Sequence, residues 1–142
     1  MNTIRIVLGD WNTLQQDAQA IRYQVFVQEQ QIPANLEWDA MDAQCLHAVA
    51  YDENNQAVGT GRLLPDAHIG RMAVLAAARN RGVGAEILRA LMQQARQRGE
   101  QAVRLNAQQS AEAFYLREGF ARDGEIFIEA GIPHVSMAHS FR

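Results

Sequence analysis

The segment 79–85 reads Arg-Asn-Arg-Gly-Val-Gly-Ala, and it joins two stretches with different hydrophobic patterns. The apolar run just before it is short, as in a strand, and apolar residues recur at helical spacing after it. Gly82 and Gly84 let the backbone turn tightly and approach a ligand without a Cβ in the way. The helix points its unpaired N–H groups and the positive end of its dipole into the turn, beside Arg79 and Arg81. The pattern predicts a site for an anion, naturally a phosphate or pyrophosphate, with a plain strand-to-helix turn as the alternative.

Motif and composition exclude several classes of protein. No Gly-Lys-Ser/Thr follows the segment, so it is not a kinase-type P-loop, and a dinucleotide fingerprint would need a third glycine. The chain has 142 residues and a net charge of −3, without a basic stripe, which predicts one domain over residues 1–142 that does not bind nucleic acid. We expect no membrane span and no signal peptide. The single cysteine, Cys45, excludes an internal disulfide, and we expect it to be an unreactive thiol of a cytoplasmic protein.

Hydrophobic periodicity and turn residues predict the order strand, helix, hairpin, strand, helix, strand, helix, hairpin. Ser110 is the predicted N-cap of the third helix, and Gly99 and Gly119 are predicted to end the second and third helices. This order indicates an α+β domain with three layers. The predicted strands are 4–8, 46–51, 57–64, 69–75, 102–106, 120–128 and 132–141, and the predicted helices are 11–28, 84–98 and 110–118. We expect residues 30–42 to form a loop with one turn of helix.

The glycine segment and the sequence downstream of it resemble the GCN5-related N-acetyltransferases (GNAT). Arg79-x-x-Gly82-x-Gly84 is similar to the Q/R-x-x-G-x-G/A signature of that family, and Phe114-Tyr115 with Gly119-Phe120 is similar to its F/L-Y-x-x-x-G-F segment. Other segments resemble the ElaA/YjcF-like bacterial branch. They are Arg22, Val25-Phe26-Val27, Glu29-Gln30, Ile32-Pro33, Leu105-Asn106-Ala107-Gln108 and Ala130-Gly131-Ile132-Pro133-His134. The resemblance covers nearly the whole chain and implies the acyl-CoA N-acyltransferase fold, a mixed central sheet with a splayed pair of parallel strands.

The resemblance implies acetyl-CoA as co-substrate and no metal. The backbone of the fourth strand would pair with the pantetheine arm, and the glycine segment would hold the pyrophosphate. Ala76 and Ala78 stand where the family often has Pro and Tyr, which we expect to affect the tightness of binding. The implied cofactor-binding residues are Met72, Ala73, Val74, Arg79, Asn80, Arg81, Gly82, Val83, Gly84, Ala85, Asn106 and Phe114.

Acetyl transfer to an amine requires a base for the amine, stabilisation of the oxyanion and an acid for the leaving thiolate. By resemblance Tyr115 is the acid, and the alternative is an ordinary residue of an amphipathic helix. The base is open among Glu29, Glu37, Asp39, Glu129 and His134, of which we favour His134 and Glu29.

Two ideas about the acceptor point to opposite chemistry. Arg22 and Arg62 could bind a carboxylate, with Phe26 and Glu129 as further candidate acceptor residues, and the alternative for each arginine is a surface ion pair. The acids Glu37, Asp39 and Asp42 could instead attract a cationic amine.

The sequence therefore indicates an acetyl-CoA-dependent N-acetyltransferase that acts on a primary amine of a small molecule or peptide. The alternatives are a catalytically silent acyl-CoA-binding module and a binder of nucleotide phosphates. Exposed sheet edges and an apolar C-terminal hairpin also suggest a homodimer.

Overall fold

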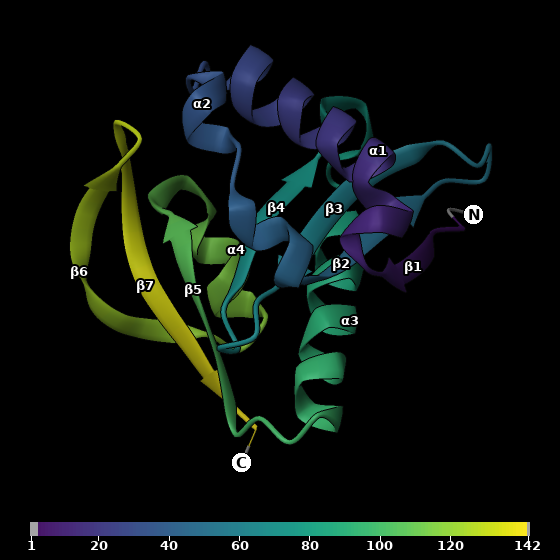
Figure 1. The fold of residues 1–142 in the computed structure, drawn as a ribbon. Coiled ribbons are helices and arrows are strands. Elements are labelled where there is room, and N and C mark those ends of the chain that lie inside the picture. Colours follow the sequence, from purple (N-terminus) through teal and green to yellow (C-terminus); the bar gives the residue numbers. More distant parts are fainter. Residues whose placement is uncertain (1–2, 142) are drawn as a thin grey trace.

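The structure, a computed structural model, describes residues 3–141 and contains two antiparallel sheets that diverge from one another (Figure 1). The sheets have the strand orders β1-β2-β3-β4 and β5-β7-β6. The strands are β1 (Arg5–Gly9), β2 (Leu46–Tyr51), β3 (Ala57–Leu63), β4 (Ile69–Val74), β5 (Ala102–Gln108), β6 (Ala121–Glu129) and β7 (Ile132–Ser140). The α-helices are α1 (Trp11–Arg22), α2 (Ala34–Glu37), α3 (Val83–Gln97) and α4 (Glu112–Arg117). The predicted α+β class and the predicted order of the main elements are confirmed.

The two sheets are joined where β4 and β5 begin. Within residues 3–141, one parallel bridge pairs His68 with Arg104, and Arg104 N donates to Ala67 O over 3.1 Å. Beyond this bridge β4 pairs with β3 and β5 pairs with β7, so the facing edges of β4 and β5 separate. A bulge in β4 sets Arg71 and Met72 opposite the single residue Gly61, which is the geometry that bends a strand away from its neighbour. The predicted splayed pair of parallel strands is confirmed.

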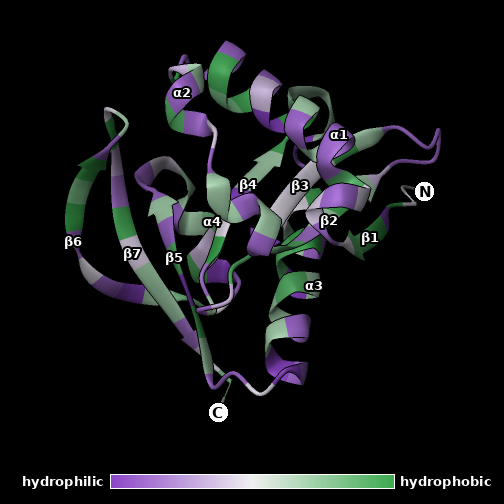
Figure 2. Ribbon diagram, in the orientation of Figure 1, coloured by the Kyte–Doolittle hydropathy of each residue, from purple (hydrophilic) through white to green (hydrophobic). Residues whose placement is uncertain are grey.

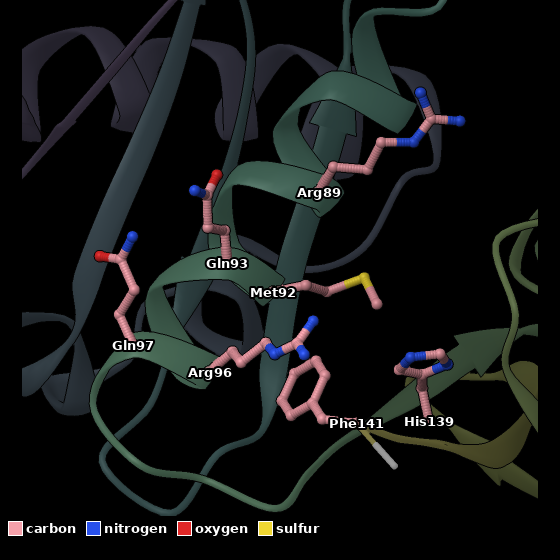
Figure 3. A pocket seen from close by; sticks show the side chains of 7 residues that line it. All are labelled: Arg89, Met92, Gln93, Arg96, Gln97, His139 and Phe141. Carbon is pink, nitrogen blue, oxygen red and sulfur yellow. The ribbon is translucent and has the colours of Figure 1, made fainter.

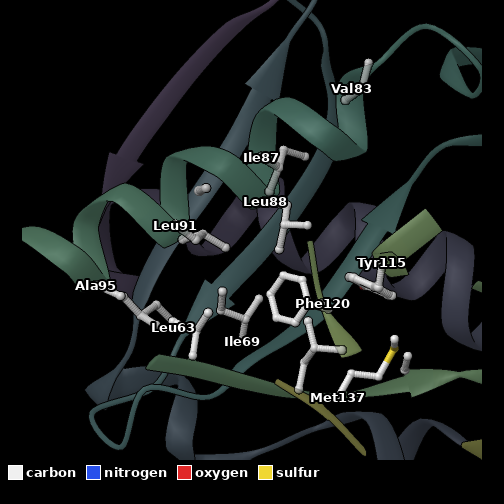
Figure 4. Packing of buried hydrophobic residues seen from close by; sticks show 14 of the residues in the cluster. Leu63, Ile69, Val83, Ile87, Leu88, Leu91, Ala95, Tyr115, Phe120 and Met137 are labelled. Atoms are coloured by element: carbon white, nitrogen blue, oxygen red, sulfur yellow. The ribbon is translucent and has the colours of Figure 1, made fainter. Parts of the chain in front are cut away.

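Helices cover both faces of the first sheet. α1 packs its apolar side, including Leu14, Ala18 and Ile21, against Val49 of β2 and Ala73 of β4. On the opposite face α3 inserts Ile87, Leu88 and Leu91 into the larger core, and all three are fully buried (Figure 4). Because helices lie on both faces, β2 and β3 are buried along most of their length and have no solvent-exposed face.

Gly59 and Gly61 allow α3 to lie close to β3. A Cβ at Gly61 would lie 2.5 Å from Met72 Sδ, 3.0 Å from Ile87 Cγ2 and 3.1 Å from Leu91 Cδ1.

We expect Gly61→Ala to lower the free energy of unfolding by about 1–3 kcal/mol, because two fully buried side chains have to shift. Urea unfolding measures this, with Gly70→Ala as the matched control in the same sheet, since a Cβ there meets only Arg62 Nε at 4.0 Å. Equal losses in the two variants would contradict the close packing.

Four local predictions need correction. The first helix does not continue unchanged to residue 28, because it becomes a π-helical segment at Tyr23–Glu29, where Gln30 N bonds Val25 O. The region 30–42 contains the predicted single turn of helix, α2, but it also leads into a 3-10 helix at Ala40–Gln44, which was not predicted. Ser110 is not an N-cap, since it lies inside a 3-10 turn. The N-cap position of α4 is occupied by Ala111, whose side chain cannot cap the helix. β5 extends two residues beyond its predicted end at Asn106.

β6 forms the outer edge of the second sheet and is exposed along almost all of its length. It carries Ile126 and Ile128, which are 45% and 67% exposed, and this stretch is hydrophobic in Figure 2. The expectation of a homodimer rests on this edge. In the part of the chain that the structure describes, no helix is both long and apolar enough to cross a membrane.

Candidate functional site

The glycine segment forms an uncapped helix N-terminus next to the opening between the sheets. Gly82 is the N-cap of α3 with φ of 80°, and no side chain caps the helix. Glu86 N donates to Gly82 O (3.1 Å), so the N–H groups of Val83, Gly84 and Ala85 come before the first bond of the helix. A Cβ at Gly82 would meet nothing within 4 Å, so the space beside the N-cap residue is open. The arrangement fits an anion that accepts several backbone hydrogen bonds.

The end of β4 presents backbone groups to the same opening. Leu75 N donates to Val58 O over 2.9 Å, so Val58 and Leu75 form a hydrogen-bonded pair of the antiparallel ladder. Gly59 and Val74 are the next pair and are therefore the non-bonded type. The N–H and C=O of Val74 consequently point away from β3 and toward the side of β5. The C=O accepts from Arg79 Nε at 2.9 Å, and the N–H could bond an extended ligand.

Arg79 and Glu29 connect this loop to the π-helical segment. The Arg79 guanidinium donates to both Glu29 carboxylate oxygens at 2.7 Å, and its Nε donates to Val74 O at 2.9 Å. The hydrogen bonds from Arg79 lower the pKa of the Glu29 carboxyl. A cavity of about 470 Å³ lies beside this pair, between the π-helical segment and the residues after β4; it is lined by Gln24, Val25, Gln28, Glu29, Leu75 and Ala76. Within residues 3–141, Arg81 has no ion-pair partner and is exposed, so it can meet an incoming anion.

Tyr115 and Phe114 of α4 lie beneath the start of α3. Phe114 Cζ would be 3.6 Å from a Cβ at Gly84, and its ring packs edge-on against Tyr115 with the ring centres 4.9 Å apart. Tyr115 also packs against Phe120 and is 7% exposed. Burial raises the pKa of Tyr115 to about 12, so its hydroxyl is protonated at neutral pH. No residue in 3–141 forms a hydrogen bond with that hydroxyl, which leaves the proton available to a ligand.

His134 lies on the opposite side of the opening, in the second sheet. Its Nδ1 is 2.7 Å from Ile132 O, and since a carbonyl can only accept, Nδ1 carries the proton and Nε2 is the acceptor in the neutral ring. Nε2 is 3.8 Å from a carboxylate oxygen of the exposed Glu129, and the ring stacks on Phe127.

Two contacts define how the neighbouring strand β5 is held. Gln108 pairs with His134 in the ladder, and its amide exchanges hydrogen bonds of 2.8 and 3.4 Å with the amide of Gln30. This contact joins the end of the π-helical segment to β5 across the opening. Asn106 was expected at a strand end but lies inside β5, where its amide oxygen accepts from Ser136 Oγ at 2.9 Å.

The residues expected to bind opposite kinds of acceptor bind one another. Arg22 donates to Glu37 at 2.6 Å and to Asp42 at 2.8 Å, and it is 2% exposed. Arg62 donates to Asp42 at 2.8 Å and to Asp39 at 2.7 Å. Burial would raise the pKa of Asp42, but the hydrogen bonds and charges of Arg22 and Arg62 outweigh burial and hold that pKa below its usual value. Neither arginine forms a surface ion pair, and neither set of charges is free to select an acceptor.

Phe26 is also engaged, since it is buried in the smaller core with Leu14 and Ile21. Sequence reasoning missed Arg71, which adds a third arginine to the cluster from the bulge of β4. The sequence showed only that Arg71 lies within a predicted strand, because no particular residue type marks a β-bulge.

A second cavity of about 520 Å³ lies away from the glycine segment, between the later turns of α3 and the end of β7 (Figure 3). It is lined by Arg89, Met92, Gln93, Arg96, Gln97, His139 and Phe141. None of the predicted site residues contributes to it, so cavity size alone would have pointed away from the uncapped helix.

Comparisons with known proteins agree with this geometry. The model of the acetyltransferase (GNAT) domain family matches residues 13–141. YjcF of Bacillus subtilis, described as an uncharacterized N-acetyltransferase, is 39% identical over 125 residues, which cover 85% of this chain and 89% of YjcF. The solved structure of a Lactobacillus plantarum protein has 30% identity and a TM-score of 0.90, with 99% of each chain covered. Escherichia coli ElaA has 26% identity and a TM-score of 0.85, with 97% of this chain and 100% of ElaA covered. The chain therefore belongs to the GCN5-related N-acetyltransferases, in the branch of ElaA and YjcF.

Proposed function

We propose that this N-acetyltransferase moves the acetyl group of acetyl-CoA directly to a primary amine of a small molecule or peptide. The observation that carries the proposal is the uncapped N-terminus of α3, which faces open space at Gly82 beside the opening between β4 and β5. The exposed Arg81 adds positive charge there. A pyrophosphate with a long, extended arm matches both parts of this site, because one part offers anion-binding amides and the other offers an unpaired strand edge.

The chain would hold acetyl-CoA mainly through its backbone. The N–H groups of segment 79–85 would bind the pyrophosphate, and the pantetheine arm would lie along the backbone of Met72, Ala73 and Val74. Phe114 lies beneath Gly84 and would form part of the wall, and Asn106 would face the arm from β5. Arg79 would position the loop, because its guanidinium already bonds Glu29 and Val74 O.

Two side chains would move protons in this proposal. The protonated Tyr115 hydroxyl would donate to the leaving sulfur, and the free Nε2 of His134 would accept a proton from the amine through water. Glu29 is a weaker candidate for the base, because Arg79 binds both of its oxygens and lowers its pKa. The oxyanion would be met by the N–H of Val74.

Isothermal titration of acetyl-CoA into the wild type and into Gly82→Glu tests where the coenzyme binds. We expect Gly82→Glu to weaken binding by at least tenfold, because it puts a negative side chain in front of the anion-binding amides. Gly99→Glu is the matched control, since Gly99 also has a positive φ, of 96°, and open space around its Cβ. Equal affinities of the two variants for acetyl-CoA would show that the pyrophosphate does not bind at this loop. A wild type that does not bind acetyl-CoA would refute the proposal.

A further inference from the structure

The buried charges under α1 and α2 are balanced in number but not in pairing. Three arginines and three acids meet there: Arg22, Arg62, Arg71, Glu37, Asp39 and Asp42. Arg22 and Arg62 each form two ion pairs of 2.8 Å or less. Arg71 has only long contacts, with Asp39 at 3.6 Å and with the carbonyl oxygen of Glu37 at 3.4 Å. Arg71 is therefore the arginine of the cluster with the weakest ion pairing.

Two guanidinium N–H groups in this cluster have no acceptor. Arg71 Nε and Arg62 Nε are both buried without a hydrogen-bond partner among residues 3–141. Burial, and then the positive charges of Arg62 and Arg22, lower the pKa of Arg71. A buried donor without an acceptor carries a desolvation penalty, and a bound carboxylate would remove that penalty for a guanidinium better than any neutral group.

Arg71 lies on β4 between the bridge at His68, where the two sheets join, and Val74 at the end of the strand. Arg71 has φ of 50°, a left-handed conformation that is unfavourable for a long side chain, and it forms the bulge with Met72. It lies three residues before Val74, or roughly 10 Å along the strand, which is within the length of a small acceptor. Its side chain is 27% exposed, whereas that of Arg22 is 2% exposed, so Arg71 is the arginine of the cluster that solvent reaches most readily.

We propose that Arg71 binds a carboxylate of the acceptor, so that the acceptor is an amino acid or a peptide whose carboxylate lies near the reacting amine. This inference rests on the proposed acetyl transfer. Arg71 acts here as a specificity-determining residue: its guanidinium orients the acceptor on the α1 face of β4, while the acetyl group is held further along the same strand. The carboxylate recognition that the sequence suggested for Arg22 and Arg62 is assigned to Arg71, which is the most exposed of the three arginines.

Matched pairs of amines test the proposal. Acetyl-CoA turnover is followed by thiol release with leucine against 3-methylbutylamine, phenylalanine against 2-phenylethylamine, and lysine against 1,5-diaminopentane. We expect the wild type to prefer the carboxylated member of at least one pair by tenfold or more in kcat/KM. Arg71→Gln should raise KM for that amino acid at least tenfold and abolish the preference, with KM for acetyl-CoA unchanged. Arg71→Lys should keep part of the preference, because it keeps the charge but not the planar fork.

A binding measurement covers the case in which none of these amines reacts. N-acetylleucine and N-acetylphenylalanine are titrated into the enzyme saturated with CoA, and we expect binding in the wild type and in the control Arg89→Gln, but not in Arg71→Gln. Arg89 pairs with Glu118 on the outer side of α3, away from the cluster. Enzyme that binds CoA but binds neither compound and shows no preference within any pair would overturn the role of Arg71 and leave the proposed function intact. A loss of stability in Arg71→Gln with an unchanged preference would show that Arg71 is purely structural.

Discussion

Tyr115→Phe should lower kcat about 100-fold or more while KM for acetyl-CoA changes less than about threefold. The substitution removes only the hydroxyl, and general acid catalysis contributes about 10²–10⁴-fold to the rate of such reactions. The ring would keep its packing against Phe114 and Phe120, so the fold and the coenzyme site should be preserved. Steady-state kinetics with an accepted amine, together with isothermal titration of acetyl-CoA, separates the two effects.

Tyr51→Phe is the matched control for this experiment. Burial, together with the hydrogen bond to Asp17, raises the pKa of Tyr51 to about 12 as well. Tyr51 packs against the smaller core, however, and its hydroxyl donates a hydrogen bond to Asp17. Its removal should leave kcat unchanged. Because the pKa of Tyr115 is raised to about 12, this group should also cause no loss of activity until the pH approaches that value. A Tyr115→Phe enzyme with full kcat, or one that has lost coenzyme binding instead, would exclude Tyr115 as the acid.

Asp42→Ala should strongly destabilise the fold. Asp42 is 3% exposed and accepts from both Arg22 and Arg62, so its loss leaves two buried guanidinium groups with one carboxylate each. Breaking a buried ion pair in this way costs about 3–5 kcal/mol. The free energy of unfolding, measured in urea at neutral pH, gives the size of the loss.

The control removes an ion pair of the same chemistry from the surface. Asp123→Ala breaks the pair between Asp123 and Arg104, whose side chains are about half exposed, and should cost at most about 1 kcal/mol. Acid provides a second check: because the pKa of Asp42 is lowered in the folded state, the unfolded chain takes up the proton first, and stability falls as the pH drops below about 3.9. That acid loss should be smaller in Asp42→Ala. Similar losses for the two substitutions at neutral pH would mean that the buried cluster does not stabilise the fold.

Most of the fold could be predicted from the sequence because the residues that end helices and form turns act locally. Gly99 and Gly119 end their helices with φ of 96° and 95°, and Ala130-Gly131 turns the last hairpin with two positive φ values. The errors arose where competing local structures have similar patterns. The apolar spacing of 11–28 suits an α-helix and a π-helical segment equally, and Ser110 has the chemistry of an N-cap although the chain forms a 3-10 turn there.

The part of the candidate site that lies in one contiguous motif could be predicted from the sequence. The part that depends on contacts between distant residues could not. The glycine segment was found because its chemistry is contiguous in the sequence. The pairing of Arg22 with Glu37 and Asp42 joins residues 15 and 20 positions apart, and that of Arg79 with Glu29 joins residues 50 apart. Charges that looked free for an acceptor were therefore already matched within the chain, whereas Arg71 was hidden inside a strand.

The bridge at His68 and Arg104 has a further consequence for how this protein recognises its coenzyme. Beyond that bridge, β4 and β5 turn their backbone edges toward each other but do not pair. Such edges invite pairing with foreign chains when they lie on an open flank, but here they are recessed between two sheets. Under the proposed function, the pantetheine arm would enter between these edges, and its binding would add to β4 the strand that the sheet lacks.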